Sequence, residues 1–317
     1  MRQKLILDVD TGTDDAVALM LAALHPGLEL IGATTVNGNV AVEVCTENSL
    51  RVFDHIGVPV PVHEGLARPI ARPDFPVRRA ELRSRGDYHG QYLDIPAAHT
   101  PKQDRRAVDF LVDTFMSAPG EVVLVATAPL SNVATALTVE PRLAAAIREM
   151  IIMGGGHEIG NVTPSAEFNV WADPEAARAV LSSGVEHLTL VPLDATHRAL
   201  VSLDDCALLR GLGTPAGTAC ATFVERRIRA YDASQPMHRP AAAPVHDALC
   251  VAALVDRSII TTRRLHVDVE THGELTVGRT VIDTHRRSRL PANADVAFDA
   301  DERAFVAMLL ETFARTT

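Results

Sequence analysis

The sequence contains few cysteines, and their spacing matches no metal or redox motif. Cys45, Cys206, Cys220 and Cys250 are far apart in the chain, and no two of them form a CxxC pair. This spacing argues against a zinc site and against a thioredoxin-like site. Each cysteine lies in an apolar or helical context, where a free thiol behaves as a small core residue. We therefore expect buried, unpaired cysteines.

The sequence also lacks a surplus of positive charge. It has 30 Lys and Arg residues against 40 Asp and Glu residues, which gives a formal net charge of −10. Binding to a nucleic-acid backbone depends on an excess of Lys and Arg, so we expect no nucleic-acid partner. Arginines do cluster at 225–229 and at 285–289. We interpret the first cluster as a solvated helix face and the second as a polar loop.

No apolar stretch is long enough to span a membrane, and the chain begins with the apolar run 4–7 without the features of a signal peptide. We therefore expect a cytoplasmic protein with no membrane partner. Internal repeats, low-complexity tracts and clear linkers are lacking as well. The sequence predicts a single domain over residues 1–317.

Short apolar runs alternate with helical patterns over the first two thirds of the chain. Nearly continuous Val, Ile and Leu runs separated by helices are typical of a parallel sheet that is covered on both faces. The predicted strands are 5–9, 28–36, 58–62, 121–126, 150–153 and 187–193. The predicted helices are 15–24, 42–56, 105–118, 132–137, 174–183, 203–209, 216–231 and 246–255.

The last part of the chain has a different pattern. Residues 264–283 alternate as in an antiparallel ribbon, and residues 301–312 have the pattern of a closing helix. Residues 67–104, rich in Pro and Arg, form the longest irregular stretch, and such loops are usually functional or mobile. The predicted fold class is α/β, a single domain with a mostly parallel central sheet flanked by helices and a small antiparallel C-terminal ribbon.

Four aspartates fall within eight positions directly after the first predicted strand. Asp8 and Asp10 are two apart on an extended segment, so they point to the same side. Gly12 permits a sharp turn, and Asp14 and Asp15 then lie in the first turn of a helix. Ligands of open α/β sheets bind beyond the carboxyl ends of the strands, which is where these aspartates lie.

Four crowded carboxylates need a compensating charge. The helix dipole favours an anion in the first turn by only about 0.3–1 kcal/mol, which is too little. A divalent cation would compensate them, and oxygen ligands alone indicate Ca²⁺ or Mg²⁺. The alternative is that Asp14 only caps the helix and the other aspartates are solvated.

Two chemistries could use this cluster. Asp8 could be the nucleophile of a metal-dependent phosphatase, although the predicted strand 150–153 is followed by Gly-Gly-Gly-His-Glu rather than by an aspartate. Alternatively, a cation lowers the pKa of a water molecule and a neighbouring carboxylate accepts the water's proton. A dinucleotide site is rejected, because the glycines at 154–160 miss the GxGxxG spacing and no helix follows them.

The segment 8–16, Asp-Val-Asp-Thr-Gly-Thr-Asp-Asp-Ala, resembles the N-terminal signature of the nucleoside hydrolases, the inosine–uridine-preferring N-ribohydrolases. Further segments match in the order of that family. They are Thr-Thr-Val-Asn-Gly-Asn at 34–39, Ala-Pro-Leu-Ser-Asn at 128–132, Met-Gly-Gly at 153–155, Glu-Phe-Asn at 167–169, Asp-Pro-Glu-Ala at 173–176 and His-Asp at 246–247.

The resemblance implies an N-glycosyl hydrolase that splits ribonucleosides into ribose and a free base, as in purine or pyrimidine salvage. It implies one Ca²⁺, held by Asp10, Asp15, Asp247 and the backbone carbonyl of Thr127. Asp10 would also be the general base. Asp8 would help to orient these metal-binding side chains without binding the ion itself. The resemblance further implies a homodimer or a homotetramer with a small nucleoside as its ligand.

The resemblance also assigns the substrate contacts. The ribose would be held by Asp14, Asn39, Met153, Asn161, Glu167 and Asn169. His246 matches the position of the acid that protonates the leaving base. A histidine suits this role because its side chain titrates near neutral pH.

The base side departs from the family pattern. The segment 86–93 keeps His89 and Gly90 but loses the glycine that usually follows, so His89, Tyr231 and His238 are only candidates for contacts with the base. The preferred base therefore stays open. A catalytically inactive protein that binds nucleosides or ribose is the non-enzyme alternative.

Overall fold

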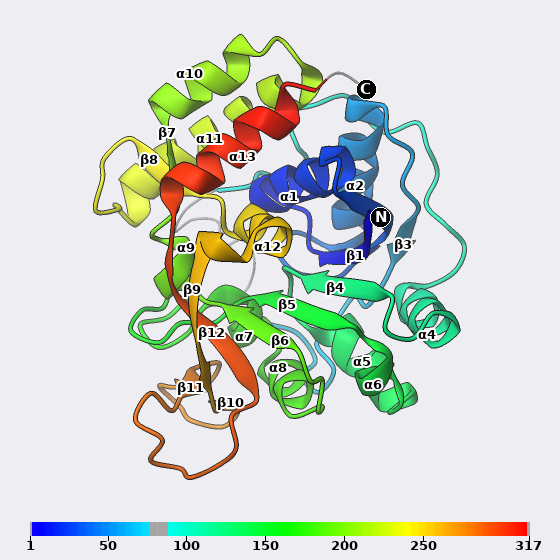
Figure 1. The fold of residues 1–317 in the computed structure, drawn as a ribbon, viewed down its shortest axis with the longest axis vertical. Coiled ribbons are helices and arrows are strands. Elements are labelled where there is room, and N and C mark those ends of the chain that lie inside the picture. The colour runs from blue at the N-terminus through cyan, green and yellow to red at the C-terminus, as the bar shows by residue number, and fades with distance from the viewer. Residues whose placement is uncertain (1, 76–80, 82–87, 316–317) are drawn as a thin grey trace.

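A central sheet of eight strands organises the chain in the computed structural model, which describes residues 2–75, 81 and 88–315. The strand order is β3-β2-β1-β4-β5-β6-β12-β9 (Figure 1). All neighbours pair in parallel except β9, which is antiparallel to β12 at the edge. The strands are β1 (Gln3–Val9), β2 (Leu28–Thr35), β3 (Val62–Glu64), β4 (Val122–Ala126), β5 (Glu149–Met153), β6 (Leu188–Val191), β9 (Ile260–Leu265) and β12 (Ala294–Ala300).

Helices cover both faces of this sheet (Figure 1). One face carries α1 (Thr13–Leu24), α2 (Val42–Ile56), α11 (Pro215–Ser234), α12 (His246–Val255) and α13 (Glu302–Phe313), and α10 (Leu203–Gly211) packs outside α11. The other face carries α4 (Ala107–Ser117), α5 (Ser131–Val139), α6 (Leu143–Ala146) and α8 (Pro174–Leu181). The two apolar clusters of the core lie between these layers and the sheet, so the predicted α/β fold class is confirmed.

Short elements connect these layers. The helices α7 (Phe168–Ala172) and α9 (Leu193–Thr196) follow β5 and β6, and a single 3₁₀ turn, η1 (Arg257–Ile259), precedes β9. Two small antiparallel ribbons complete the fold. They are β7 (Leu200–Ser202) with β8 (Ala242–Pro244), and β10 (Val267–Val269) with β11 (Thr280–Ile282).

The strand predicted at 58–62 is wrong, because β3 begins only at Val62. Pro59 and Pro61 lie within the predicted range, and a proline has no N–H to donate to a neighbouring strand. Pairing with β2 therefore begins where the prolines end, with Val62 opposite Ala33. This shift places His63 and Glu64 at the carboxyl end of the strand.

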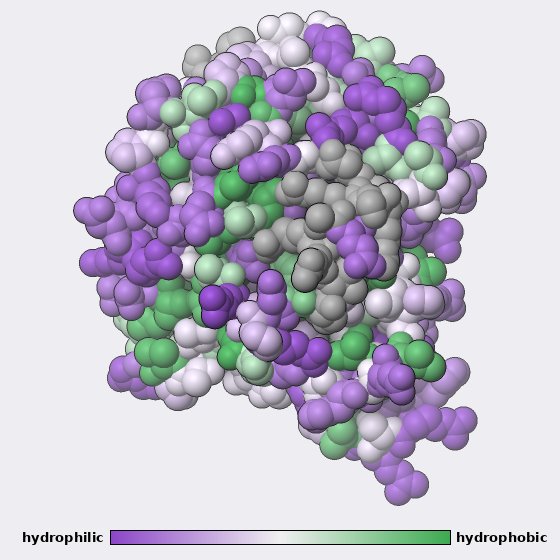
Figure 2. Space-filling model, turned by 180° about the vertical axis from the view of Figure 1, so that it is seen from behind, coloured by the Kyte–Doolittle hydropathy of each residue, from purple (hydrophilic) through white to green (hydrophobic). Residues whose placement is uncertain are grey.

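The predicted ribbon at 264–283 is only partly correct. Its first residues belong to β9, which joins the edge of the main sheet beside β12, a strand that the sequence pattern did not predict. The loop 285–289 that follows β11 is exposed, as expected. It lies on the end of the molecule that projects at the bottom of Figure 1 and is hydrophilic in Figure 2.

The four cysteines are buried and form no disulfide bonds with one another, which confirms the expectation that they belong to the core. Burial raises the pKa of the Cys206 thiol to about 12. In the part of the chain that the structure describes, no helix is both long and apolar enough to cross a membrane.

Candidate active site

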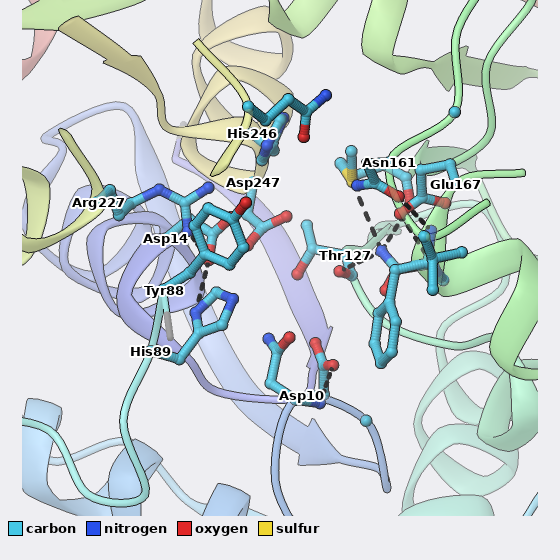
Figure 3. Close-up of a pocket in the computed structure, with 18 of the residues that line it drawn as sticks. Asp10, Asp14, Tyr88, His89, Thr127, Asn161, Glu167, Arg227, His246 and Asp247 are labelled. Atoms are coloured by element: carbon cyan, nitrogen blue, oxygen red, sulfur yellow. Dashed lines mark hydrogen bonds and ion pairs between the residues drawn. The ribbon is translucent and has the colours of Figure 1, made fainter. Parts of the chain in front are cut away.

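A cavity of about 430 Å³ lies beyond the carboxyl ends of the central strands. Figure 3 shows side chains from separate elements around it, with Asn161 and Glu167 on one side and Arg227, Tyr88 and His89 on the opposite side. The structure brings most of the predicted site residues to this cavity. Those that line it are Asp10, Asp14, Asn39, His89, Thr127, Met153, Asn161, Glu167, Asn169, Tyr231, His246 and Asp247.

Asp15 lies in the first turn of α1, completely buried below this cavity. Its Oδ2 accepts the backbone N–H of Gly12 at 2.9 Å, and its Oδ1 accepts the hydroxyl of Thr127 at 3.1 Å. The first contact caps the helix, and the second joins α1 to the residue that follows β4. Asp15 is therefore fixed in position before any ligand binds.

Gly12 and Gly38 allow two close approaches at this site. A Cβ atom on Gly12 would lie 2.2 Å from His89 Nδ1, and a Cβ atom on Gly38 would lie 1.9 Å from Asp10 Oδ2. Gly12 has φ −100°, which other residues also adopt, so it is required for the approach of His89 rather than for a sharp turn. Beside Gly38, the N–H of Asn39 donates to Asp10 Oδ2 at 2.7 Å.

Asp14, Asp15 and Asp247 each offer one carboxylate oxygen, and these oxygens lie within 4.8 Å of one another. Burial and neighbouring aspartates raise the pKa of Asp15 to about 7 and raise the pKa of Asp10 and Asp247 well above the ordinary value. Burial is the larger cause of these shifts, and the like charges of the neighbouring carboxylates add to it. The donors are all hard oxygens, so the residues fit a Ca²⁺ or Mg²⁺ ion.

Asp8 is fully buried and does not line the cavity. Its Oδ1 accepts the hydroxyl of Thr34 at 2.6 Å and the amide of Asn132 at 2.7 Å. Burial raises its pKa to about 6. A nucleophile must reach its substrate, so this position argues against the phosphatase alternative and is consistent with a supporting role.

One wall of the cavity is formed around the short helix α7. The carboxylate of Glu167 caps this helix by accepting the N–H groups of Asn169 and Val170, and it also accepts the N–H of Gly155. Burial nevertheless raises the pKa of Glu167 to about 7. The amide nitrogen of Asn169 donates to the carbonyl of Thr127 at 2.9 Å, so Asn169 can offer its amide oxygen to the cavity.

The opposite wall contains His89 and Tyr88, which lie on the loop that follows the undescribed residues 82–87. The backbone N–H of Thr13 donates to His89 Nδ1 at 3.1 Å. This contact places the ring proton of neutral His89 on Nε2. The Tyr88 hydroxyl makes a 2.5 Å hydrogen bond with the hydroxyl of Ser234 and so ties the loop to α11.

Tyr231 and His246 form a hydrogen-bonded pair within the cavity. The Tyr231 hydroxyl lies 2.7 Å from His246 Nε2, and the Thr196 hydroxyl lies 2.7 Å from His246 Nδ1. Burial and the nearby Arg227 lower the pKa of His246 well below its ordinary value, so the ring is neutral. Both nitrogens of His246 are therefore engaged, and Tyr231 and His246 both line the cavity.

Two predictions about this region need correction. The cluster 225–229 is not simply a solvated helix face, because Arg227 is only 1% exposed and lines the cavity. Its position four residues before Tyr231 places both side chains on one face of α11, which is the signal that could have identified it. His238 lines a separate cavity with His157, Asp194 and His197, so it is not placed to contact a base in the main cavity.

The comparisons with known proteins agree with this geometry. The family described as inosine-uridine preferring nucleoside hydrolase matches residues 5–307. The pyrimidine-specific ribonucleoside hydrolase RihB of Escherichia coli (strain SE11) is 35% identical over 314 residues, which cover 98% of this chain and 96% of RihB.

Among solved structures, the purine-preferring ribonucleoside hydrolase from Gardnerella vaginalis has a TM-score of 0.89 at 32% identity, covering 98% of each chain. The plant nucleoside hydrolase PpNRh1 has a TM-score of 0.86 at 27% identity, covering 99% of each chain. The fold and the acidic cavity are thus those of a nucleoside hydrolase, and the chain belongs to the inosine–uridine-preferring nucleoside hydrolase family. It is an N-glycosyl hydrolase that acts on ribonucleosides, with an aspartate cluster as its candidate metal site.

Proposed function

We propose that the protein hydrolyses the N-glycosidic bond of ribonucleosides in a calcium-dependent reaction, with Asp10 as general base. The observation that carries this proposal is the buried carboxylate cluster at the floor of the cavity. Asp10, Asp15, Asp247 and the carbonyl of Thr127 would hold the ion. When bound, Ca²⁺ lowers the pKa of a water molecule and holds the ribose diol. Asp10 accepts the proton of the attacking water.

The attack of water at the anomeric carbon breaks the bond to the base nitrogen, whose electron pair leaves with the base. Positive charge develops on the ribose ring in this step. Asp14, Asn39 and Asn169 would hold the ribose hydroxyls, while Asn161 and Glu167 would bind the 5′-hydroxyl over Met153. Asp14, Met153 and Asn169 lie on α1, β5 and α7, so the regular elements of the fold orient these contacts with the sugar.

Tyr231, His246 and Thr196 would supply the proton that the departing base needs. With its proton on Nε2, neutral His246 donates to the Tyr231 oxygen and accepts from the Thr196 hydroxyl at Nδ1. The Tyr231 hydroxyl proton is then directed to the cavity. His246 thus acts through Tyr231, and His89 provides a second contact with the base through its Nε2–H.

We expect Tyr231→Phe to lower kcat for inosine by roughly 100-fold, which is within the range for loss of a general acid. Hydrolysis of p-nitrophenyl riboside should change little, because its leaving group departs without a proton. Tyr92→Phe is the matched control, since Tyr92 is 47% exposed and outside the cavity. Equal slowing of both substrates by Tyr231→Phe would show that Tyr231 acts on the ribose or the metal site instead.

A reducing-sugar assay over purine and pyrimidine ribonucleosides tests the function itself. We expect ribose release from at least one nucleoside, and loss of that release with a chelator. Binding of nucleosides without release of ribose would identify an inactive binding protein instead. The panel also determines the preferred base, for which the relatives named above differ. We further expect a homodimer or a homotetramer, which light scattering can determine.

A further inference from the structure

Arg227 is a buried cation that the proposed reaction does not use. Its Nη1 lies 3.0 Å from Asp14 Oδ1, and both side chains are almost completely buried. The guanidinium is fixed on two further sides, because Nε donates to the carbonyl of Pro244 at 2.9 Å and Nη1 donates to the Thr13 hydroxyl at 3.3 Å. This geometry gives a rigid charge in a defined position rather than a flexible surface arginine.

Asp14 has two competing neighbours. One of its oxygens converges with those of Asp15 and Asp247, so Asp14 lies close enough to join them around a cation. Arg227 and His89 both lie beside Oδ1, at 3.0 Å and 3.5 Å. Because Arg227 binds Oδ1, Oδ2 is the oxygen through which Asp14 can reach a ligand in the cavity.

The charges at the cavity floor support a division of roles among the aspartates. Asp10, Asp14, Asp15 and Asp247 are four buried carboxylates, and one divalent cation offsets two of their charges. Arg227 offsets a third negative charge, that of Asp14, with which it forms an ion pair. The cation then faces three carboxylates, and Asp14 and Arg227 form a neutral pair beside it.

We propose that Arg227 is a positioning residue that holds Asp14 away from the metal ion, so that Oδ2 of Asp14 accepts a ribose hydroxyl. This inference rests on the calcium site of the proposed function. This role of Arg227 explains why an oxygen of Asp14 converges with those of Asp15 and Asp247 although Asp14 is not a ligand of the metal ion. A residue that served only to stabilise the fold would not oppose metal binding.

The test measures calcium affinity and kinetics together on the full chain carrying Arg227→Met. Loss of the positive charge frees Asp14 to coordinate the ion, so we expect calcium to bind at least tenfold more tightly in titration calorimetry. We also expect the KM for the best nucleoside to rise by roughly tenfold or more, because Asp14 no longer holds the ribose. Arg227→Lys keeps the charge and should retain a calcium affinity close to that of the wild type.

Arg229→Met is the matched control, since it removes the same charge from an exposed position on the same helix. It should change neither calcium affinity nor KM. Unchanged or weaker calcium binding by folded Arg227→Met would overturn the inference while leaving the proposed function intact. If Arg227→Met does not fold, Arg227→Gln, which retains a donor without the charge, provides the same test. A wild-type chain that binds no calcium would instead overturn the metal site of the proposed function.

Discussion

Asp10→Asn should lower kcat by roughly 1,000-fold or more while the protein stays folded. The substitution keeps the shape of the side chain and an oxygen that can accept the N–H of Asn39, which now binds Asp10 Oδ2 at 2.7 Å. It removes the proton acceptor and one negative charge of the metal site. Loss of a general base alone typically slows a reaction by 10²–10⁴-fold, as a rough range. The measurement is steady-state ribose release from the best nucleoside of the panel.

Asp232→Asn is the control for this substitution, because it makes the same chemical change on an exposed side chain of α11. It should leave kcat unchanged. Calorimetric titration of Asp10→Asn with calcium separates the two roles of Asp10, since loss of a ligand weakens binding and loss of a base does not. Turnover of Asp10→Asn within about tenfold of the wild type would rule out Asp10 as the base.

The sequence predicts the centre of the fold better than its edges. The strands β1, β4, β5 and β6 are almost completely buried, and their Val, Ile and Leu runs therefore identify them. At one edge, two prolines delay the start of β3. At the other edge, β12 has the sequence Ala-Asp-Val-Ala-Phe-Asp-Ala, with neither a continuous Val, Ile and Leu run nor a regular alternation. It is defined by pairing with β6 and β9, which are distant in sequence. Local patterns do not contain that information.

The functional site, like the edges of the sheet, could be predicted from local sequence patterns only in part. The aspartates of 8–15 could be assigned to one site because they follow a strand and share a helix turn. Arg227 could not, because its charge pattern is also that of a solvated helix face, and only the packing of α11 against α1 brings it to Asp14. His238 is close in sequence to Tyr231, but α11 ends at Ser234 and the chain continues to another cavity.

Removal of the metal with a chelator should abolish ribose release and lower the Tm, and added calcium should restore both. An ion that binds only the native state stabilises it by about 2.7 kcal/mol at a free concentration of 100 times its Kd. For a chain of 317 residues, such a change corresponds to a Tm shift of roughly 4 °C. Activity that survives thorough chelation would contradict the metal-dependent mechanism.

The pH dependence of the chelated protein tests the origin of this stabilisation. Burial raises the native pKa values of Asp15 and Glu167 to about 7, whereas the unfolded chain has ordinary values of 3.8 and 4.5. Between these values the native state holds more protons than the unfolded state, so stability falls as the pH rises from about 4 to about 7 and then levels off. We therefore expect the chelated protein to have a lower Tm at pH 7.5 than at pH 5, and calcium to raise the Tm more at pH 7.5. A chelated protein whose Tm rises over this interval would show that the acidic cluster is not destabilised by its own charge, and the argument for a cation at the floor of the cavity would fail with it.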